Sequence, residues 1–358
     1  MAKRGNYFKG LKVVELASVL AGPSAGLFFA ELGAEVIKIE NKRTGGDVTR
    51  SWKLPAEKKS DPASAYYHSV NFFKKVLFAD FSSEKDLKKV LLMIEKSDIV
   101  IANFKKEQEK KYGFYWENLK KINPRLIYAT ISGFGKKSNR VAYDLILQAE
   151  SGFMSMNGDK ASGPLKMPVA LIDLLAGHQL KEGILVALMK REKTGLGSKV
   201  SVSLFESAIA SMANQSSNFL NAGFVPVLQG SLHPNIAPYG EIFKTKDKKD
   251  IVFAIGSDVQ FKKLCEILNI AEIYSSPKYS TNQNRVKNRK QLFKLLQNRI
   301  KNIASDKLLN QCHNNEIPTG MIKNLREVFK DQNSKKLIVS KKEKNSTISY
   351  VRSSVFKF

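Results

Sequence analysis

One aspartate, Asp173, lies where a long helix is predicted to begin, over residues 173–192. Asp is among the commonest helix N-caps, because its carboxylate accepts hydrogen bonds from the first backbone N–H groups. The same position favours chemistry, since the positive end of the helix dipole stabilises a carboxylate anion and would keep it ionised near neutral pH. An ionised carboxylate is a nucleophile that can attack an acyl carbonyl. The position alone leaves both the cap and the nucleophile open.

A second group of candidate residues surrounds a glycine loop. LIYATISGFG at 126–135 is typical of a strand that runs into a loop, and Gly133 and Gly135 could present backbone N–H groups to an oxyanion in a substrate pocket. Tyr143 follows, in Ala142-Tyr143-Asp144. It is either a packed aromatic or a pocket residue, and a tyrosine hydroxyl is a poor base at neutral pH.

Several common kinds of site are excluded. The loop ASVLAGP at 17–23 has one glycine where a dinucleotide fingerprint has three, and no P-loop lysine follows. The next helix could still bind a phosphate or carboxylate at its N-terminus. Two cysteines exclude a disulfide scaffold and a four-cysteine zinc site. The histidines show no metal-ligand spacing, so we expect no metal. We also expect no tightly bound cofactor. These residues are His68, His178, His233, His313, Cys265 and Cys312.

The elements that would position these residues alternate between strand and helix. This alternation predicts an α/β fold with a doubly wound parallel sheet, whose ligand site lies beyond the carboxyl ends of the strands. The predicted strands are 11–16, 34–40, 76–81, 98–102, 126–135 and 198–204, with helices at about 83–96, 143–155, 173–192 and 205–221.

The second part of the chain has a different pattern. Residues 223–240 are rich in proline and glycine and are predicted to be a linker after a large domain over 1–222. EIFKTKDKKDIVFAIG at 241–256 is typical of a β-hairpin, and helices are predicted at about 258–268 and 286–301. We therefore expect a smaller α+β domain over 241–325.

The chain is strongly basic. Its 358 residues hold 59 Lys and Arg against 33 Asp and Glu, a net charge of +26. Such an excess suggests a polyanion as partner, but the basic residues are spread evenly and mixed with acids, as in KKEQEKK at 105–111. A nucleic-acid partner is therefore not expected. No apolar run approaches the ~18 residues of a membrane helix, and the N-terminus lacks the pattern of a signal peptide, so we expect a cytoplasmic protein without a membrane partner.

Ordered motifs over residues 9–358 resemble the family III CoA-transferases, the group of formyl-CoA transferase, crotonobetainyl-CoA:carnitine CoA-transferase and the 2-methylacyl-CoA racemases. The segments that carry the resemblance are LKVVELASVLAGPSAGLFFAELGAEVIKIEN at 11–41, GGDVTR at 45–50, NPRLIYATISGFG at 123–135, YDLILQAESGFMSMNG at 143–158, PVALIDLLAGHQL at 168–180, HPNIAPYGEIFK at 233–244 and NEIPTGMIKNLREVFKD at 315–331.

The resemblance implies a Rossmann-like large domain, a smaller domain, and a return of the chain to the large domain over 326–358. Two such chains form an interlocked homodimer, with CoA on the large domain and the active site at the dimer interface. The family's nucleophilic aspartate corresponds to Asp173, which forms a mixed anhydride with the acyl group of a thioester. The CoA contacts that correspond by position are Val19, Ala21, Lys74, Lys75, Asn103 and Lys111.

Three functions follow as hypotheses. The first is a CoA-transferase that moves CoA from an acyl-CoA to a carboxylic acid. The second is an acyl-CoA racemase, which the resemblance disfavours, because racemases carry histidine at the position of Tyr143. The third is an inactive homologue that binds polyanions.

Overall fold

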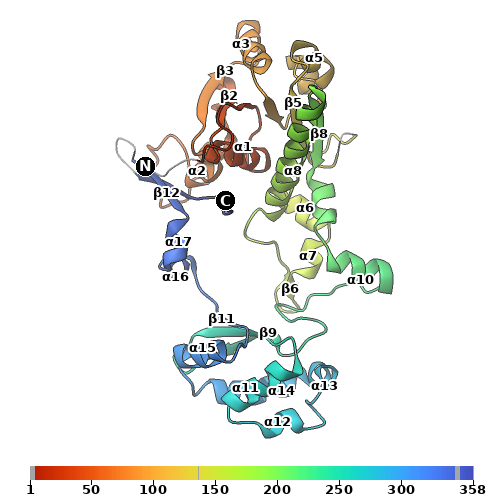
Figure 1. Ribbon diagram of the computed structural model, residues 1–358, viewed down its shortest axis with the longest axis vertical. Helices are drawn as coiled ribbons and strands as arrows, with labels where there is room; N and C mark the ends of the chain where they lie inside the picture. Colours follow the sequence, from red (N-terminus) through yellow and green to blue (C-terminus); the bar gives the residue numbers. More distant parts are fainter. Residues whose placement is uncertain (1–4, 136, 343–346, 358) are drawn as a thin grey trace. The chain divides into compact units, whose positions relative to one another are not determined.

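The computed structural model describes residues 5–135, 137–342 and 347–357 (Figure 1). The chain forms two compact units. The first comprises Met1–Met154, Lys166–Pro226 and Lys335–Phe358, and the second comprises Ser155–Leu165 and Val227–Ser334. The predicted boundaries differ from this division, because most of the predicted linker packs within the second unit, and so does the short segment at 155–165.

A six-stranded, all-parallel sheet is the centre of the first unit, and the α/β fold class predicted from the sequence is confirmed. Its strand order is β3-β2-β1-β4-β5-β8, so the chain crosses from one side of β1 to the other after β3. In open parallel sheets ligands bind outside the carboxyl ends of the strands at such a reversal. The strands are β1 (Lys12–Glu15), β2 (Glu35–Asn41), β3 (Lys75–Ala79), β4 (Ile99–Ala102), β5 (Ile127–Ser132) and β8 (Ser198–Ser203).

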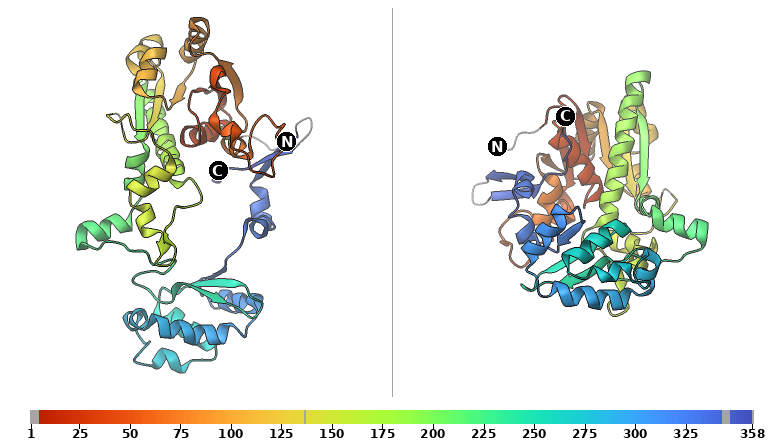
Figure 2. Two further views of the ribbon diagram at one scale, coloured as in Figure 1. Left: turned by 180° about the vertical axis from the view of Figure 1, so that it is seen from behind. Right: turned by 60° about the horizontal axis from the view of Figure 1, so that its bottom comes forward.

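Both faces of this sheet are covered by helices. Side chains alternate along a strand, so Val13 enters one core cluster and Val14 the other. Helices α1 (Ala21–Glu31), α8 (Leu171–Thr194) and α9 (Leu204–Ala210) pack on the first face, while α3 (Glu84–Glu95) and α5 (Trp116–Ile122) pack on the second. Helix α8 is the long helix that runs alongside the sheet (Figure 2).

Shorter helices connect these elements. The helix predicted at 205–221 is two helices, because Ala213 takes a left-handed φ of 44° that interrupts the turn between them. The remaining helices before residue 223 are η1 (Lys42–Thr44), η2 (Val48–Ser51), α2 (Ala65–Asn71), α4 (Lys106–Tyr112), α6 (Asp144–Glu150), α7 (Phe153–Met156) and α10 (Asn214–Ala222).

The end of the chain also packs on the first unit. The hairpin of β12 (Ile338–Lys342) and β13 (Thr347–Val351) follows α17 (Gln332–Lys336). The buried carboxylate of Glu31 in α1 accepts hydrogen bonds from the Tyr350 hydroxyl at 2.9 Å and from the Ser354 N–H at 2.8 Å. These bonds anchor the segment from Tyr350 to Ser354 to α1.

The second unit is an antiparallel sheet with helices. Strand β10 lies between β9 and β11, and one apolar core, which includes Cys265 and Cys312 as free thiols, joins the sheet to its helices. Among the described residues, no helix has the length and hydropathy needed to cross a membrane. The elements are β6 (Gly158–Asp159), β7 (Gly163–Pro164), β9 (Tyr239–Lys244), β10 (Asp250–Ala254), β11 (Thr319–Met321), α11 (Asp258–Ile267), α12 (Glu272–Ser275), α13 (Asn282–Lys287), α14 (Arg289–Ile300), α15 (Ser305–Asn314) and α16 (Leu325–Val328).

Candidate active site

A pocket of about 610 Å³ opens in the first unit at the carboxyl ends of β1, β4, β5 and β8. This is the edge of the sheet at which the strand order predicts a ligand. The pocket brings together most of the residues singled out from the sequence. Those that line it are Val19, Ala21, Asn103, Gly133, Gly135, Tyr143 and Asp173.

The loop after β1 is held from two sides. The Ser18 N–H donates to Oδ1 of Asn103 at 3.2 Å, and the Asn103 amide donates back to the Ser18 carbonyl at 3.1 Å. The Val19 N–H points at both oxygens of Asp47, at 3.2 and 3.3 Å. Val19 has a φ of 71°, which is strained for a β-branched residue, so these bonds hold a backbone shape that the chain would not choose alone.

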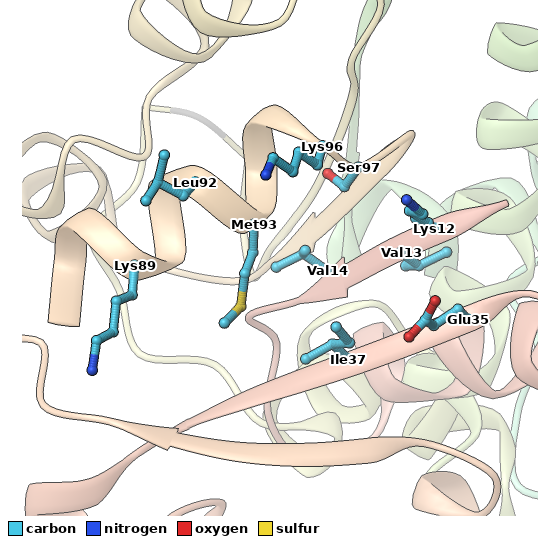
Figure 3. Close-up of a pocket in the computed structure, with 10 residues that line it drawn as sticks. All are labelled: Lys12, Val13, Val14, Glu35, Ile37, Lys89, Leu92, Met93, Lys96 and Ser97. Atoms are coloured by element: carbon cyan, nitrogen blue, oxygen red, sulfur yellow. The ribbon is translucent and has the colours of Figure 1, made fainter.

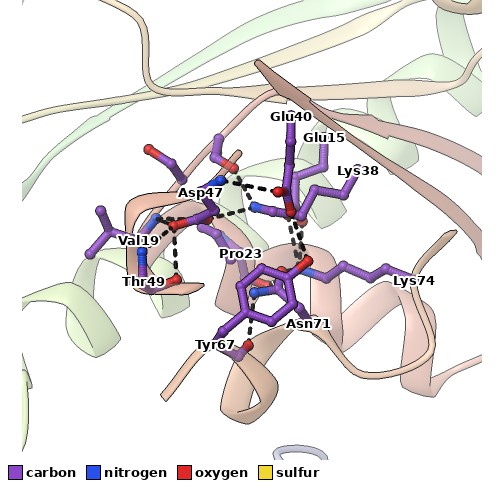
Figure 4. Close-up of polar contacts among 12 residues, drawn as sticks. Glu15, Val19, Pro23, Lys38, Glu40, Asp47, Thr49, Tyr67, Asn71 and Lys74 are labelled. Carbon is purple, nitrogen blue, oxygen red and sulfur yellow. Dashed lines mark hydrogen bonds and ion pairs between the residues drawn. The ribbon is translucent and has the colours of Figure 1, made fainter. Parts of the chain in front are cut away.

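A buried network of charges lies beneath this loop and supports it (Figure 4). The Lys38 ammonium contacts Glu15 at 3.1 Å and Asp47 at 3.0 Å. Glu40 accepts two hydrogen bonds from Arg50, at 2.6 and 3.0 Å. Burial acts to raise the pKa of Asp47, but Lys38 and the Thr49 N–H outweigh it and hold that pKa below its ordinary value.

Lys74 belongs to this network and not to the pocket. Its Nζ donates to both oxygens of Glu15, at 2.8 and 2.9 Å, and to the carbonyl of Pro23 at 2.8 Å. The ammonium is fully buried, so the expectation that it meets a CoA phosphate is corrected: its hydrogen bonds are taken up inside the protein. Gly26 of α1 is required here, because a Cβ at that position would overlap the Glu15 carboxylate.

The other two predicted lysines also do not line the pocket. Lys75 is exposed on the edge strand β3 and pairs with Glu35, and Lys111 lies near the end of α4. Four lysines that the motifs did not single out take their place in the pocket wall. The run KKEQEKK contained three of them, but a mixed charge run is equally typical of a solvated face. The four are Lys105, Lys106, Lys110 and Lys199.

Asp173 is the third residue of α8, which begins at Leu171. Its side chain is nearly buried, with 7% of the residue exposed, and among the described residues no group forms a hydrogen bond or ion pair with its carboxylate. Burial and the neighbouring carboxylate of Asp144 raise the pKa of Asp173 to about 7. A carboxylate without partners in a pocket is a functional-site candidate on physical grounds.

Asp144 takes the capping place that the sequence suggested for Asp173. Its Oδ1 accepts from the N–H of Ile172 at 2.7 Å and from the N–H of Asp173 at 3.3 Å, and Gln148 binds its other oxygen at 2.5 Å. The helix dipole therefore acts first on Asp144. Burial and the second carboxylate act against the ionisation of Asp173 that the helix dipole favours, and they raise its pKa.

Two aromatic residues near Asp173 were missed in the sequence. The carboxylates of Asp173 and Asp144 reinforce the effect of burial on Tyr66, whose pKa rises to about 12. Tyr66 makes an edge-to-face contact with Trp52 at 5.2 Å, and Trp52 lies 6.5 Å from Tyr143. The position of Trp52 two residues after the end of the GGDVTR motif was the one available signal.

Gly133 allows the glycine loop to close on the segment that carries Tyr143. A Cβ at Gly133 would overlap the Cβ of Ala142, so a larger residue would push the two segments apart. No group of three or more His, Cys, Asp or Glu side chains in the part of the chain that the structure describes is placed to hold a metal.

A second pocket of about 410 Å³ lies at the other end of the sheet, between β1, β2 and α3 (Figure 3). Its apolar floor is formed by Val14, Ile37 and Met93, and Lys12 and Lys96 lie at its rim. None of the predicted site residues lines it.

Comparison with known proteins decides the family. Residues 8–356 match CoA-transferase family III. The chain belongs to this family. It is 37% identical to the succinate–glutarate CoA-transferase of Agrobacterium fabrum over 337 residues, which cover 92% of this chain and 84% of that protein. It is 34% identical to the human succinyl-CoA:glutarate CoA-transferase, with 90% of this chain and 73% of that protein covered.

A solved structure agrees with this assignment. A CaiB/BaiF family protein from Brucella suis is 36% identical and superposes with a TM-score of 0.87, over 99% of this chain and 93% of that one. The resemblance seen in the sequence is therefore confirmed, and the protein is a CoA-transferase of family III.

Proposed function

We propose that this CoA-transferase moves CoA from an acyl-CoA donor to a carboxylic acid, with Asp173 as the covalent nucleophile. One observation carries the proposal: Asp173 is nearly buried, has no partner for its carboxylate among the described residues, and lines the pocket at the reversal of strand order. The glycine loop and the loop after β1 lie in the same wall, where their backbone N–H groups can meet an oxyanion.

The carboxylate of Asp173 is sufficient for a complete catalytic cycle. A carboxylate oxygen of Asp173 attacks the thioester carbonyl, the C–S bond breaks, and CoA leaves as the thiolate with a mixed anhydride formed. The thiolate then attacks the aspartyl carbonyl, which releases the donor acid and forms an aspartyl thioester. The acceptor carboxylate attacks that thioester, the C–S bond breaks, and CoA leaves again as the thiolate with a second anhydride formed. The thiolate then attacks the carbonyl of the acceptor acyl group in this second anhydride, which yields the new acyl-CoA and restores the Asp173 carboxylate.

We assign the phosphates and pantetheine of CoA to the pocket wall away from Asp173. Val19, Ala21 and Asn103 remain in the proposed contact set, because they line the pocket at the end of β1 and β4. The lysines that support phosphate binding are those of the wall, as point charges of the right sign. These are Lys105, Lys106, Lys110 and Lys199.

The acids are proposed to be dicarboxylic. The relatives in Agrobacterium fabrum and human are named for succinate and glutarate, two dicarboxylic acids that differ by one methylene. We further propose that the protein acts as a homodimer in the cytoplasm. The exposed apolar side chains of Phe219, Leu220 and Val225, on and just after α10, support a protein partner for that surface.

The test of the proposed function combines turnover with trapping. The protein is incubated with succinyl-CoA and a panel of carboxylic acids, and new acyl-CoA species are measured by mass spectrometry. Hydroxylamine added without an acceptor attacks the activated aspartyl group and should leave a hydroxamate on the peptide that holds Asp173. Absence of both the transfer and the hydroxamate would exclude the proposal, and loss of α-deuterium from a labelled 2-methylacyl-CoA would favour a racemase.

The pH dependence should follow the ionisation of Asp173. With a pKa of about 7 and a nucleophile that must be ionised, kcat/KM should rise about tenfold per pH unit below about pH 6, reach half of its maximum near pH 7 and level off above about pH 8. Asp144→Asn removes the carboxylate charge that, together with burial, raises the pKa of Asp173. The midpoint of the kcat/KM profile should therefore move to lower pH by about half a unit to one unit.

The matched control for this prediction is Glu84→Gln, which removes one exposed carboxylate from α3 and should leave the midpoint unchanged. A profile that stays flat between pH 5.5 and 8 in the wild-type enzyme would contradict the assignment.

A further inference from the structure

Arg140 contributes a guanidinium to the wall of the pocket that holds Asp173. Its two terminal nitrogens pair with the two carboxylate oxygens of Glu150, one of them at 3.0 Å. This is the parallel, two-bond geometry by which arginine recognises a carboxylate. Arg140 is therefore already arranged to bind a carboxylate, and it lines the same pocket as Asp173.

The orientation of the Arg140 guanidinium is fixed by an aromatic ring. It lies over the ring of Phe134 in the glycine loop, 4.0 Å from the ring centroid. Phe134 in turn packs against Phe205 and the main core of the first unit. An arginine that stacks on a fixed ring presents its N–H groups in a defined plane, so less rotational freedom is lost when a ligand binds.

The carboxylate that occupies Arg140 is exchangeable. The side chains of Arg140 and Glu150 are 56% and 40% exposed, so water surrounds their ion pair. Ion pairs that water surrounds contribute little to stability. A substrate carboxylate of the same geometry can displace Glu150 at little cost, and the freed Glu150 side chain would be solvated.

Arg140 is also tied by the chain to the reacting group. It stands shortly before Tyr143 and Asp144, and Asp144 binds the backbone N–H of Asp173. Among the described residues that line the pocket, Arg140 is the one arginine, and the other cations there are lysines. Lysine is a point charge suited to phosphates, whereas arginine pairs with a planar carboxylate through two bonds.

We propose that Arg140 binds the second carboxylate of a dicarboxylic substrate and displaces Glu150, so that it selects dicarboxylic over monocarboxylic acids. The first carboxyl group of the same acid, as thioester or as free carboxylate, reacts at Asp173. This inference rests on the proposed function of Asp173 and names the residue that would give it substrate selectivity.

The test uses matched donors that differ in the second carboxylate. Formation of the Asp173 hydroxamate is measured with succinyl-CoA and with butyryl-CoA, and with glutaryl-CoA and valeryl-CoA, for wild type and variants. Arg140→Gln should slow the dicarboxylic donors 10- to 100-fold and leave the monocarboxylic donors within about twofold. Glu150→Gln should lower KM for the dicarboxylic donors by about two- to fivefold, because the internal competitor loses its charge.

Two further variants complete the design. Arg140→Lys keeps the charge without the two-bond geometry. With dicarboxylic donors only, its rate of hydroxamate formation should lie between those of wild type and Arg140→Gln. Lys137→Gln removes a positive charge from an exposed position in the same loop and should change neither donor class. The three side chains, Arg140, Glu150 and Lys137, are exposed, so thermal unfolding of all four variants should stay close to that of the wild type.

The outcomes separate the two proposals. Equal slowing of both donor classes by Arg140→Gln would overturn the inference and assign Arg140 to CoA itself. Unchanged rates with every donor would also overturn it. Failure of wild-type protein to form any Asp173 hydroxamate would instead overturn the proposed function.

Discussion

Replacement of Asp173 by asparagine should reduce CoA transfer by about 10⁴-fold or more. Asparagine has the shape of aspartate, but its amide oxygen does not form an anhydride that CoA can open, so no covalent acyl-enzyme can form. The loss should appear in kcat, since the groups assigned to CoA binding are untouched. The measurement is turnover of succinyl-CoA with glutarate, together with the hydroxylamine trap.

The same variant should be more stable than wild type at alkaline pH, and this distinguishes lost chemistry from lost folding. The pKa of Asp173 is about 7 in the folded protein and 3.8 ordinarily. Between pH 4 and 7 the folded chain therefore holds a proton that the unfolded chain has released, so stability falls as pH rises through this window. Asp173→Asn removes that loss, which amounts to at most about 4 kcal/mol.

Thermal unfolding of wild type and Asp173→Asn at pH 5 and pH 8 tests whether the stability difference has the expected sign. The Tm difference should favour the variant and should grow from pH 5 to pH 8. Activity within tenfold of wild type would exclude Asp173 as the nucleophile. A variant that loses both activity and stability at pH 8 would instead show that the carboxylate is ionised and paired in the folded state.

Lys38→Met should destabilise the first unit by about 3–5 kcal/mol, the second large effect we expect. The Lys38 ammonium is buried between Glu15 and Asp47 and also donates to the Ala17 carbonyl at 2.7 Å. Methionine fills the volume but leaves two buried carboxylates without their shared cation. Asp47 also orients Val19, so the loss should disturb the pocket loop as well as the core.

Lys75→Met is the matched control. Lys75 lies on the neighbouring strand β3 and pairs with Glu35, but these side chains are 72% and 45% exposed. Exposed pairs contribute about 0–1 kcal/mol, so this variant should unfold near the wild-type temperature. For Lys38→Met, a fall in Tm on the order of 10 °C is expected for a domain of this size. Equal Tm values for the two variants would show that the buried network contributes no more than a surface pair.

Local patterns were sufficient for the sheet and for the position of Asp173. Burial on alternate positions or on one helix face is set by neighbouring residues, so strands such as 34–40 and the helix around Asp173 could be predicted from periodicity. The order of parallel strands then places their carboxyl ends together. That placement explains why Val19, Asn103, Gly133 and Asp173 meet in one pocket.

Ionic partnerships could not be predicted in the same way. The sequence shows a lysine in the same way whether its ammonium binds a phosphate or a buried glutamate. Lys74 pairs with Glu15, which is far from it in the chain. The pairing depends on which strands are neighbours and on how deeply each side chain is buried, and neither quantity has a local sequence signature.

Asp173 shows most clearly which properties follow from the sequence and which depend on the tertiary structure. Its residue type and its place at the start of a helix follow from the sequence, and so does its capacity to act either as a cap or as a nucleophile. The fold assigns the cap to Asp144, which lies nearly thirty residues earlier in the chain. The burial of Asp173 and the nearby charge of Asp144, both products of tertiary structure, raise the pKa of Asp173. Charge interactions and desolvation act through space, so they are defined only when the chain has folded.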